Sequence, residues 1–328
     1  MKPDILVIAD FPNWAYYEIQ QFIKNNISDE FNIYCDFLIY NTKKKTRNPI
    51  KRIKLLKEKL TFRNIKKDQV YDIVVYLGFY FDELMNITWK TNKVIKGIYT
   101  ESFPPQNANN VTTILDFKKK YLRNTDALVC GSEKTKKIYQ ALPNINIHQA
   151  SAIKDKNFFK RKLSKRINHD DTFIIGWTGN PNRPFKGFYT HIIPAIELAK
   201  KTHPNIQLKS RFSGPYKTLP FFYCDVDVIL IASDADVGPS LFSEASLMEV
   251  PAISTNVGLP SRVIKNYKNG IIVNRDVKDL ANKIIELYEN RELVYTMSKN
   301  IRKDYLSIFD SNKIAQNWKD IFYKTLNT

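Results

Sequence analysis

The chain has 328 residues, 43% hydrophobic and 13% aromatic, which supplies enough apolar side chains for packed cores and excludes a disordered protein. Its length exceeds what one hydrophobic core usually fills, so two domains are expected. The net charge of +18, from 51 Lys and Arg against 33 Asp and Glu, favours a polyanionic neighbour such as anionic lipid or nucleic acid. An AT-rich genome explains the same lysine excess equally well.

Export, membrane crossing and metal binding are not indicated by the sequence. No apolar run approaches the roughly 20 residues that span a bilayer, and the first ten residues, MKPDILVIAD, have the pattern of a strand rather than a signal peptide. The three cysteines are too far apart for a disulfide framework or a zinc site. A cytoplasmic protein is expected, and peripheral contact with the inner membrane face stays open.

Short apolar runs alternate with helical patterns in the first half of the chain. Strands are expected at residues 4–10, 71–80 and 126–132, and a helix at 14–26. This alternation predicts a parallel sheet covered by helices. A polar, basic stretch at about residues 155–170 interrupts the pattern and marks a link between two α/β halves.

A basic segment lies inside the first half. Residues 43–67 contain twelve Lys and Arg and a single acid, Glu58. Ile53, Leu56 and Leu60 recur at helical spacing, so a basic amphipathic helix is expected, of a kind that can lie on an anionic membrane or along a phosphate backbone. A solvated helix that packs its apolar side on its own domain explains the pattern equally well.

The α/β pattern restarts in the second half. Helices are expected at residues 240–249, after Asp276 as N-cap, and around Trp318 at the end of the chain. Strands are expected at residues 171–180, 206–212, 226–233, 251–256 and 270–274. Ligands of such sheets bind beyond the carboxyl ends of the strands, and a cleft between two such halves is the expected site.

The stretch DADVGPSLFSE combines acidic side chains with the Gly-Pro-Ser start of an expected helix. A helix is expected to begin at Ser240, and the amides of Gly238, Pro239 and Ser240 would then cradle a phosphate at its positive end. Asp236 stands just before this helix and Glu244 about one turn inside it. Carboxylate oxygens suit the vicinal hydroxyls of a ribose or hexose, so the pattern predicts a nucleotide-sugar site.

The loop GWTGNPNRPFKG would supply the cations of this site. Arg183 and Lys186 beside a diphosphate would offset the negative charge that grows as the diphosphate departs. No cluster of His, Asp and Glu has metal-ligand spacing, so no metal is expected to take part. Each of these residues also has a purely structural interpretation. Lys186 would then be a solvated lysine of the loop, and Glu244 an acid that interacts favourably with the helix dipole.

From about residue 171 to the C-terminus, the chain resembles glycosyltransferase family 4, whose GT-B fold has two Rossmann-like domains facing a central cleft. The E-x7-E pattern of that family stands here as DVGPSLFSEASLMEVPAISTNVG, and its KG as Lys186 and Gly187. The resemblance is weak in the N-terminal half. It implies an acceptor-binding domain over residues 1–160, a nucleotide-sugar-binding domain over 161–308, and a terminal helix over 309–328 that crosses back to the first domain.

The resemblance further implies a retaining glycosyltransferase that moves a sugar from a UDP- or GDP-sugar to a hydroxyl, with no bound cofactor. It places Asp236 at the donor sugar, Glu244 at the ribose and Lys186 at the diphosphate. The catalytic candidates are Asp236, Lys186, Arg183 and Glu101. The donor-binding candidates are Glu244 and residues of the adjoining loops: Gly179, Asn180, Gly238, Pro239, Ser240, Tyr216 and Gly258.

The chain departs from the family pattern at two important places. Asp236 stands where the family carries Glu, and no histidine precedes His148, although the family often has a catalytic histidine in its first domain. Glu101 or Ser102, just after an expected strand, is the substitute. The acceptor stays open between a cell-surface or lipid-linked glycan and a hydroxymethylated base in DNA, as in phage enzymes. A non-catalytic GT-B-like binding subunit is the alternative to an enzyme.

Overall fold

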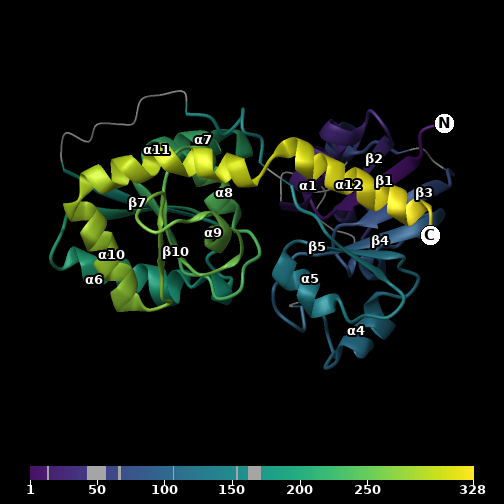
Figure 1. Cartoon of the computed structure of the whole chain (residues 1–328), viewed down its shortest axis with the longest axis horizontal. Helices are drawn as coiled ribbons and strands as arrows, with labels where there is room; N and C mark the ends of the chain where they lie inside the picture. Colours follow the sequence, from purple (N-terminus) through teal and green to yellow (C-terminus); the bar gives the residue numbers. More distant parts are fainter. Residues whose placement is uncertain (13–14, 43–56, 66–67, 106, 153, 162–170) are drawn as a thin grey trace. The chain divides into compact units, whose positions relative to one another are not determined.

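A computed structural model describes residues 1–12, 15–42, 57–65, 68–105, 107–152, 154–161 and 171–328. The chain folds into two compact units. Unit 1 contains Met1–Ile153 and Ser311–Thr328, and unit 2 contains Lys154–Asp310. Each unit is built on a parallel β-sheet covered by helices (Figure 1). The predicted α/β fold with two Rossmann-like domains is confirmed.

The sheet of unit 1 has the strand order β2-β1-β3-β4-β5-β6, and its strands pair in parallel. Strand β1, second in this order, pairs Ile5 with Ile33 of β2 on one side and with Ile73 of β3 on the other. These three isoleucines are at most 7% exposed, as expected for a parallel sheet with both faces covered. The strands are β1 (Asp4–Ala9), β2 (Asn32–Phe37), β3 (Tyr71–Tyr76), β4 (Thr91–Ile98), β5 (Ala127–Cys130) and β6 (Asn146–Gln149).

Two helices of unit 1, α4 and α5, begin where a side chain accepts from one of the first backbone amides. Thr113 accepts from the amide of Asp116, and the Asp116 carboxylate accepts from the amide of Thr113, which forms a capping box at the start of α4. Ser132 caps α5 by accepting from the amide of Thr135. The helical segments are α1 (Ala15–Ile27), η1 (Leu38–Tyr40), α3 (Phe81–Leu84), α4 (Ile114–Tyr121), α5 (Glu133–Tyr139) and α12 (Ser311–Leu326).

The sheet of unit 2 has the strand order β11-β10-β9-β7-β8, again all parallel. The chain starts on β7, moves outward to β8, and then returns past β7 to β9, so the winding direction reverses between β7 and β9. Loops that leave the carboxyl ends of these two strands diverge there and leave room for a ligand. The strands are β7 (Phe173–Thr178), β8 (Ile206–Arg211), β9 (Val228–Ile231), β10 (Ala252–Thr255) and β11 (Ile271–Val273).

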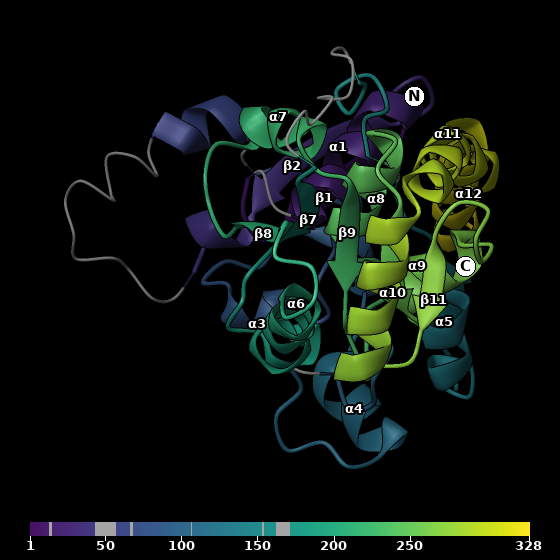
Figure 2. The same cartoon turned by 90° about the vertical axis from the view of Figure 1, so that its left-hand side faces the viewer.

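The helices of unit 2 pack on this sheet, α6 beside α10 (Figure 2) and α8 beside α11. Asp276 caps α10 by accepting from the amides of Lys278 and Asp279, which confirms the predicted N-cap. The π-helical turn η3 leads directly into α6, and Pro194 stands in the first turn of α6, where a missing N–H is tolerated. The helical segments are η2 (Pro184–Lys186), η3 (Phe188–Ile192), α6 (Ile193–Lys200), η4 (Tyr216–Thr218), α7 (Leu219–Cys224), α8 (Ser240–Leu247), α9 (Gly258–Val263), α10 (Val277–Glu289) and α11 (Arg291–Ile308).

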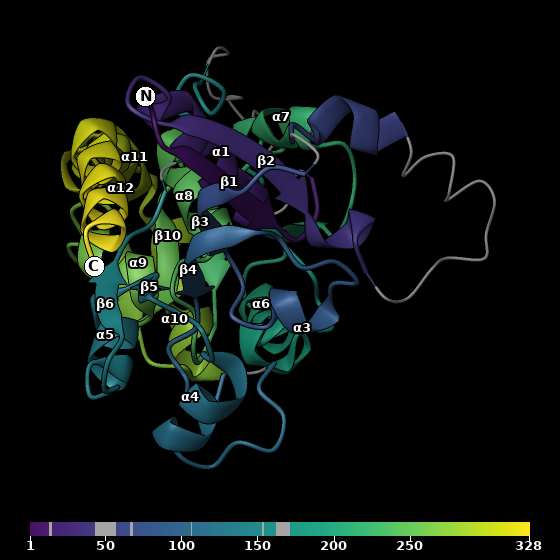
Figure 3. The same ribbon diagram turned by 90° about the vertical axis from the view of Figure 1, so that its right-hand side faces the viewer.

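The terminal helix α12 belongs to unit 1, where it packs beside α1 (Figures 1 and 3). Trp318 is fully buried, and its indole N–H donates to the carbonyl of Ser151 at 2.8 Å. The Phe322 ring packs edge-to-face on Phe31, with ring centroids 5.4 Å apart. The predicted return of the C-terminal helix to the first domain is confirmed. Among the described residues, no helix has the length and apolar character needed to cross a bilayer.

The structure corrects one prediction on the organisation of the chain, the domain boundary, and describes only part of the segment on which another prediction rests. Residues 154–160, which the sequence analysis assigns to the first domain, belong to unit 2. The predicted basic helix lies mostly outside the described residues, because residues 43–56 and 66–67 are not described. Of its apolar positions only Leu60 is described; it lies in the helical stretch 57–62 and is 86% exposed.

Replacement of Trp318 tests how strongly α12 is anchored to unit 1. We expect Trp318→Ala to lower the free energy of unfolding of unit 1 by about 3–5 kcal/mol, because it leaves a cavity in a fully buried site. Trp318→Phe, which keeps most of the packing but loses the N–H donor, should cost about 1–3 kcal/mol. Chemical denaturation followed by circular dichroism measures both changes. The exposed neighbour Gln316 is the control, since Gln316→Ala should shift stability by less than about 0.5 kcal/mol.

Candidate functional site

The candidate site of unit 2 lies where its sheet reverses winding direction. The loop after β7 carries Gly179, Asn180, Arg183 and Lys186, and the loop after β9 carries Asp236. A backbone hydrogen bond of 3.0 Å from the amide of Asp234 to the carbonyl of Phe185 joins these two loops. The fold therefore brings the predicted cationic loop and the predicted acidic loop together.

Lys186 and Asp236 form an ion pair across these loops. The Lys186 ammonium bonds Oδ2 of Asp236, and the amide of Gly238 donates to Oδ1 at 3.3 Å. Both side chains are largely buried, with 19% and 13% of their surface exposed. Asp236, predicted to contact the donor sugar, and Lys186, predicted to contact the diphosphate, are therefore in direct contact with each other.

Two glycines allow this close packing. Gly187 has a φ of +67°, and a Cβ there would lie 2.6 Å from the carbonyl oxygen of Ala232. Gly258, at the start of α9, has a φ of +31°, and a Cβ there would lie 2.1 Å from the carbonyl oxygens of both Asp236 and Val237. Gly258 therefore fixes the position of the loop that presents Asp236.

The predicted phosphate cradle offers fewer amides than expected. Pro239 has no N–H, and the amide of Gly238 already donates to Asp236. The amide of Phe242 bonds the carbonyl of Pro239 at 2.8 Å. Ser240 begins α8 and is half-buried, so its amide is the remaining donor of the Gly-Pro-Ser stretch for an anion at this helix end.

Glu244 lies inside α8 and is held by two donors. Its side chain is only 5% exposed. The Lys154 ammonium bonds Oε1 at 2.9 Å, and the Tyr223 hydroxyl donates to Oε2 at 2.6 Å. A buried carboxylate is stable only when it is paired and hydrogen-bonded, and these two contacts meet that requirement.

The direction of these hydrogen bonds follows from the charges. Burial, the nearby Glu244 carboxylate and the hydrogen bond to it raise the pKa of Tyr223 well above its usual value. The Tyr223 hydroxyl is therefore protonated and donates to Glu244, while the hydroxyl of Thr178, 3.3 Å away, donates to Tyr223. Thr178 ends β7, so the chain of hydrogen bonds runs from the sheet edge to Glu244.

Aromatic rings adjoin the Glu244 pair. The Tyr216 ring stacks on Phe158 with an interplanar angle of 5° and centroids 5.2 Å apart. The Lys154 ammonium lies 5.9 Å from the centroid of the Tyr216 ring, a cation–π geometry. Tyr216 was predicted for the site, whereas Lys154 was missed, because a single lysine 90 positions before Glu244 carries no local pattern.

Three predicted residues are not members of these pairs. Gly179, Asn180 and Arg183 are exposed on the loop after β7. The Asn180 side chain accepts from the amide of Asn182 at 3.0 Å and so shapes the turn. The structure places Arg183 at the N-cap of η2, three positions before Lys186.

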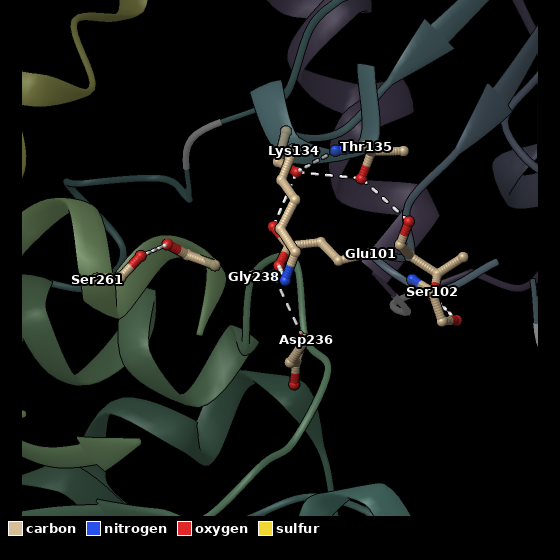
Figure 4. A network of polar contacts seen from close by, with 10 residues as sticks. Glu101, Ser102, Lys134, Thr135, Asp236, Gly238 and Ser261 are labelled. Carbon is tan, nitrogen blue, oxygen red and sulfur yellow. Dashed lines mark hydrogen bonds and ion pairs between the residues drawn. The ribbon is translucent and has the colours of Figure 1, made fainter. Parts of the chain in front are cut away.

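Glu101 lies in unit 1, just after β4, in a polar network at the edge of that sheet (Figure 4). Its side chain is 4% exposed; it accepts from the hydroxyl of Ser132 at 2.8 Å and pairs with Lys134 at 3.3 Å. Ser132 also bonds Thr135, whose hydroxyl donates to the carbonyl of Thr100 at 3.0 Å. Ser102, the second candidate, bonds the hydroxyl of Thr100 at 3.0 Å. The network joins the ends of β4 and β5.

No group of three or more His, Cys, Asp and Glu side chains within the described ranges is arranged to hold a metal ion. The polar groups of the unit 2 site are instead carboxylates, ammonium groups and hydroxyls that already bond one another.

Known proteins resemble this chain in sequence and in fold. Residues 194–304, which include Asp236 and Glu244, match the family described as glycosyl transferases group 1. The matched stretch lies within unit 2. The capsular polysaccharide biosynthesis glycosyltransferase CapM of Staphylococcus aureus is 30% identical over 194 residues, 51% of this chain and 49% of CapM. The chain thus matches about half the length of this relative.

Two further similarities extend the comparison. The poly(ribitol-phosphate) alpha-N-acetylglucosaminyltransferase of Staphylococcus aureus strain COL is 24% identical over 125 residues, 38% of this chain and 24% of that protein. The crystal structure of Anabaena HepE in complex with UDP and glucose has a TM-score of 0.68 at 12% identity, and the match covers 98% of this chain and 99% of HepE. The fold of the whole described chain is therefore GT-B.

Replacement of Gly258 tests the packing beneath the Asp236 loop. We expect Gly258→Ala to lower the free energy of unfolding of unit 2 by more than about 1 kcal/mol, because the methyl group meets two backbone carbonyls and the positive φ disfavours alanine. Gly238→Ala is the matched control: its Cβ would meet only the end of the Leu259 side chain, at 3.0 Å. Equal losses for the two variants would contradict this account of the loop.

Proposed function

We propose that the protein is a retaining, metal-independent glycosyltransferase that moves a sugar from a UDP-sugar to a hydroxyl of a cell-envelope glycan. Unit 2 would bind the donor and unit 1 the acceptor. The single observation that carries this proposal is the joint placement of Lys186 with Asp236 and of Glu244 with its two donors on the loops and helix that follow β7 and β9 of a group 1 domain.

The donor would meet complementary groups at this edge of the sheet. The Lys186 ammonium and the amide of Ser240 suit the diphosphate, since the first is a cation and the second is a donor at the N-terminus of α8. Asp236 suits the hydroxyls of the sugar, and Glu244 suits those of the ribose. UDP is proposed because the HepE complex contains UDP; the retaining, metal-independent course rests on the resemblance of the sequence to family 4.

Catalysis would then depend on charge at the leaving group. As the bond between the sugar and the diphosphate breaks, negative charge grows on the departing oxygens. Lys186 is held in place by Asp236 before the donor arrives, so its ammonium needs little reorganisation to stabilise that charge. Arg183, exposed on the same loop, would add a second cation.

The acceptor is proposed from the relatives. The names of CapM and of the poly(ribitol-phosphate) enzyme describe the synthesis of capsular polysaccharide and the modification of a poly(ribitol-phosphate). A cell-envelope glycan with free hydroxyls belongs to the same chemical class. The net charge of +18 favours an acceptor that carries phosphate or carboxylate groups.

Nucleotide binding is the first test of this function. UDP at about 100 times its dissociation constant should stabilise the protein by about 2.7 kcal/mol, which a thermal-shift measurement detects. We expect Glu244→Gln to reduce the UDP-induced shift strongly, because the amide replaces one acceptor oxygen with a donor. Asp279→Asn, on α10, removes a carboxylate elsewhere in unit 2 and is the control. Absence of a shift with UDP in the wild-type protein would sink the proposed donor.

The role of Lys186 is tested by kinetics. We expect Lys186→Met to lower kcat by about 100-fold and to raise KM for the UDP-sugar by less than about tenfold, because the ammonium acts on charge that develops in the transition state. Transfer to a polysaccharide acceptor, with the product anomer read by NMR, measures both the rate and the stereochemistry. A change in KM with kcat intact would assign Lys186 to ground-state binding instead.

A further inference from the structure

The segment that carries Lys154 is firmly attached to unit 2. Phe159 is fully buried, and the Asp155 carboxylate accepts from the amides of Asn157 and Phe158 at 2.8 and 3.1 Å. The amide of Phe159 bonds the carbonyl of Asp155 at 2.9 Å. These contacts fix the turn immediately after Lys154, so its ammonium meets Glu244 from an ordered backbone.

Arg302 of α11 joins this segment to the helix that carries Glu244. Its guanidinium donates to the carbonyls of Phe159 at 2.8 Å and Lys156 at 2.9 Å, and also to the carbonyl of Leu247. Leu247 is the last residue of α8. The planar fork of arginine holds five N–H donors in a fixed geometry that reaches separated carbonyls, whereas the lysine ammonium is a compact group at the end of a flexible stem. One side chain therefore ties the two elements of the Lys154–Glu244 pair to each other.

From this arrangement we propose that Lys154 is a positioning residue that aims Glu244 at the ribose hydroxyls, and that Arg302 keeps the two elements in register. The proposal rests on the function proposed above and names the determinant of its selectivity for ribose. Lys154 bonds Glu244, and the effect proposed for it on the ligand acts through that carboxylate.

The remaining acceptor capacity of Glu244 supports this role. An ionised carboxylate has about four lone-pair sites on two oxygens. Lys154 occupies Oε1 and Tyr223 occupies Oε2, so each oxygen keeps a further site whose direction is set by its donor. Two acceptors of fixed direction match two neighbouring hydroxyls. Without the ammonium, a carboxylate that is 5% exposed would lose one of its two donors and turn toward water, and the match would be lost.

The structure also agrees better with a Lys154 that stays bonded to Glu244 than with a Lys154 that blocks the ribose site as a plug and is displaced when the nucleotide binds. A plug that moved together with its backbone would require the segment after Lys154 to leave unit 2. That movement would break two of the three hydrogen bonds of Arg302 and would expose Phe159, which is 0% exposed. The buried attachment therefore favours a lysine that stays in place when the nucleotide binds.

The test compares the binding of UDP with that of 2′,3′-dideoxy-UDP by calorimetry, on the full chain. We expect the wild-type protein to bind UDP at least about tenfold more tightly, because the dideoxy compound leaves the Glu244 oxygens without their hydroxyl partners. In Lys154→Met, the ratio of the affinity for UDP to the affinity for 2′,3′-dideoxy-UDP should fall below about threefold. The affinity for UDP itself should fall by about tenfold. The matched control is Lys156→Met, since the Lys156 side chain is exposed on the same segment and should leave the ratio unchanged.

Arg302→Lys is the second arm, because it leaves both members of the pair intact and remains informative if Lys154→Met does not fold. We expect Arg302→Lys to lower the ratio of UDP affinity to dideoxy-UDP affinity, as Lys154→Met does. Lys303→Met, at the exposed neighbouring position, should leave this ratio unchanged. A merely structural role for Arg302 would lower the melting temperature and leave the ratio at its wild-type value.

The outcomes separate this proposal from the proposed function. If the wild-type protein binds UDP and Lys154→Met keeps the full preference for ribose, the positioning role is wrong and the proposed donor site stands. Tighter UDP binding by Lys154→Met would also overturn it, since Lys154 would then compete with the nucleotide. If the wild-type protein does not bind UDP, the proposed donor and this inference fail together.

Discussion

The candidate site depends on a carboxylate that is kept out of water. Glu244 is 5% exposed, and such a group persists in a folded protein only with donors on its oxygens. Lys154 and Tyr223 supply them from two other elements, and Thr178 supports Tyr223 from the end of β7. The requirement to satisfy one buried acid therefore draws together the segment after residue 153, the sheet edge, α7 and α8.

The parallel sheet explains why these groups meet at one edge. Parallel strands send their outgoing loops to the same side, and the reversal of winding between β7 and β9 opens a space between two of them. Gly187 and Gly258 let the backbone of these loops approach more closely than any side chain would allow. The Lys186–Asp236 pair lies in this packed region, so a small displacement of the Asp236 loop would separate a predicted sugar contact from a predicted phosphate contact.

Sequence reasoning worked best where the relevant signal was local. Alternating apolar runs predicted β1, β3 and β5 of the first sheet and all five strands of the second. Asp276 was predicted as the cap of α10, and the stretch from Asp236 to Glu244 was predicted to hold the site. Prediction from the sequence was wrong or incomplete where no short motif or clear periodicity marks the element. The short strand β6 and the long helix α11 were not predicted, and the division of the chain was placed after residue 160 instead of residue 153.

The amino-acid sequence by itself determined the α/β class, the two Rossmann-like sheets and the identity of the acids and cations near the strand ends, because periodicity and short motifs depend on neighbours within a few positions. Only the tertiary structure decided which partners those groups have. Lys154 reaches Glu244 across 90 positions, and Arg302 reaches Leu247 across 55. Such pairs arise from how helices and loops pack on the sheet, and packing brings together residues whose separation along the chain carries no pattern.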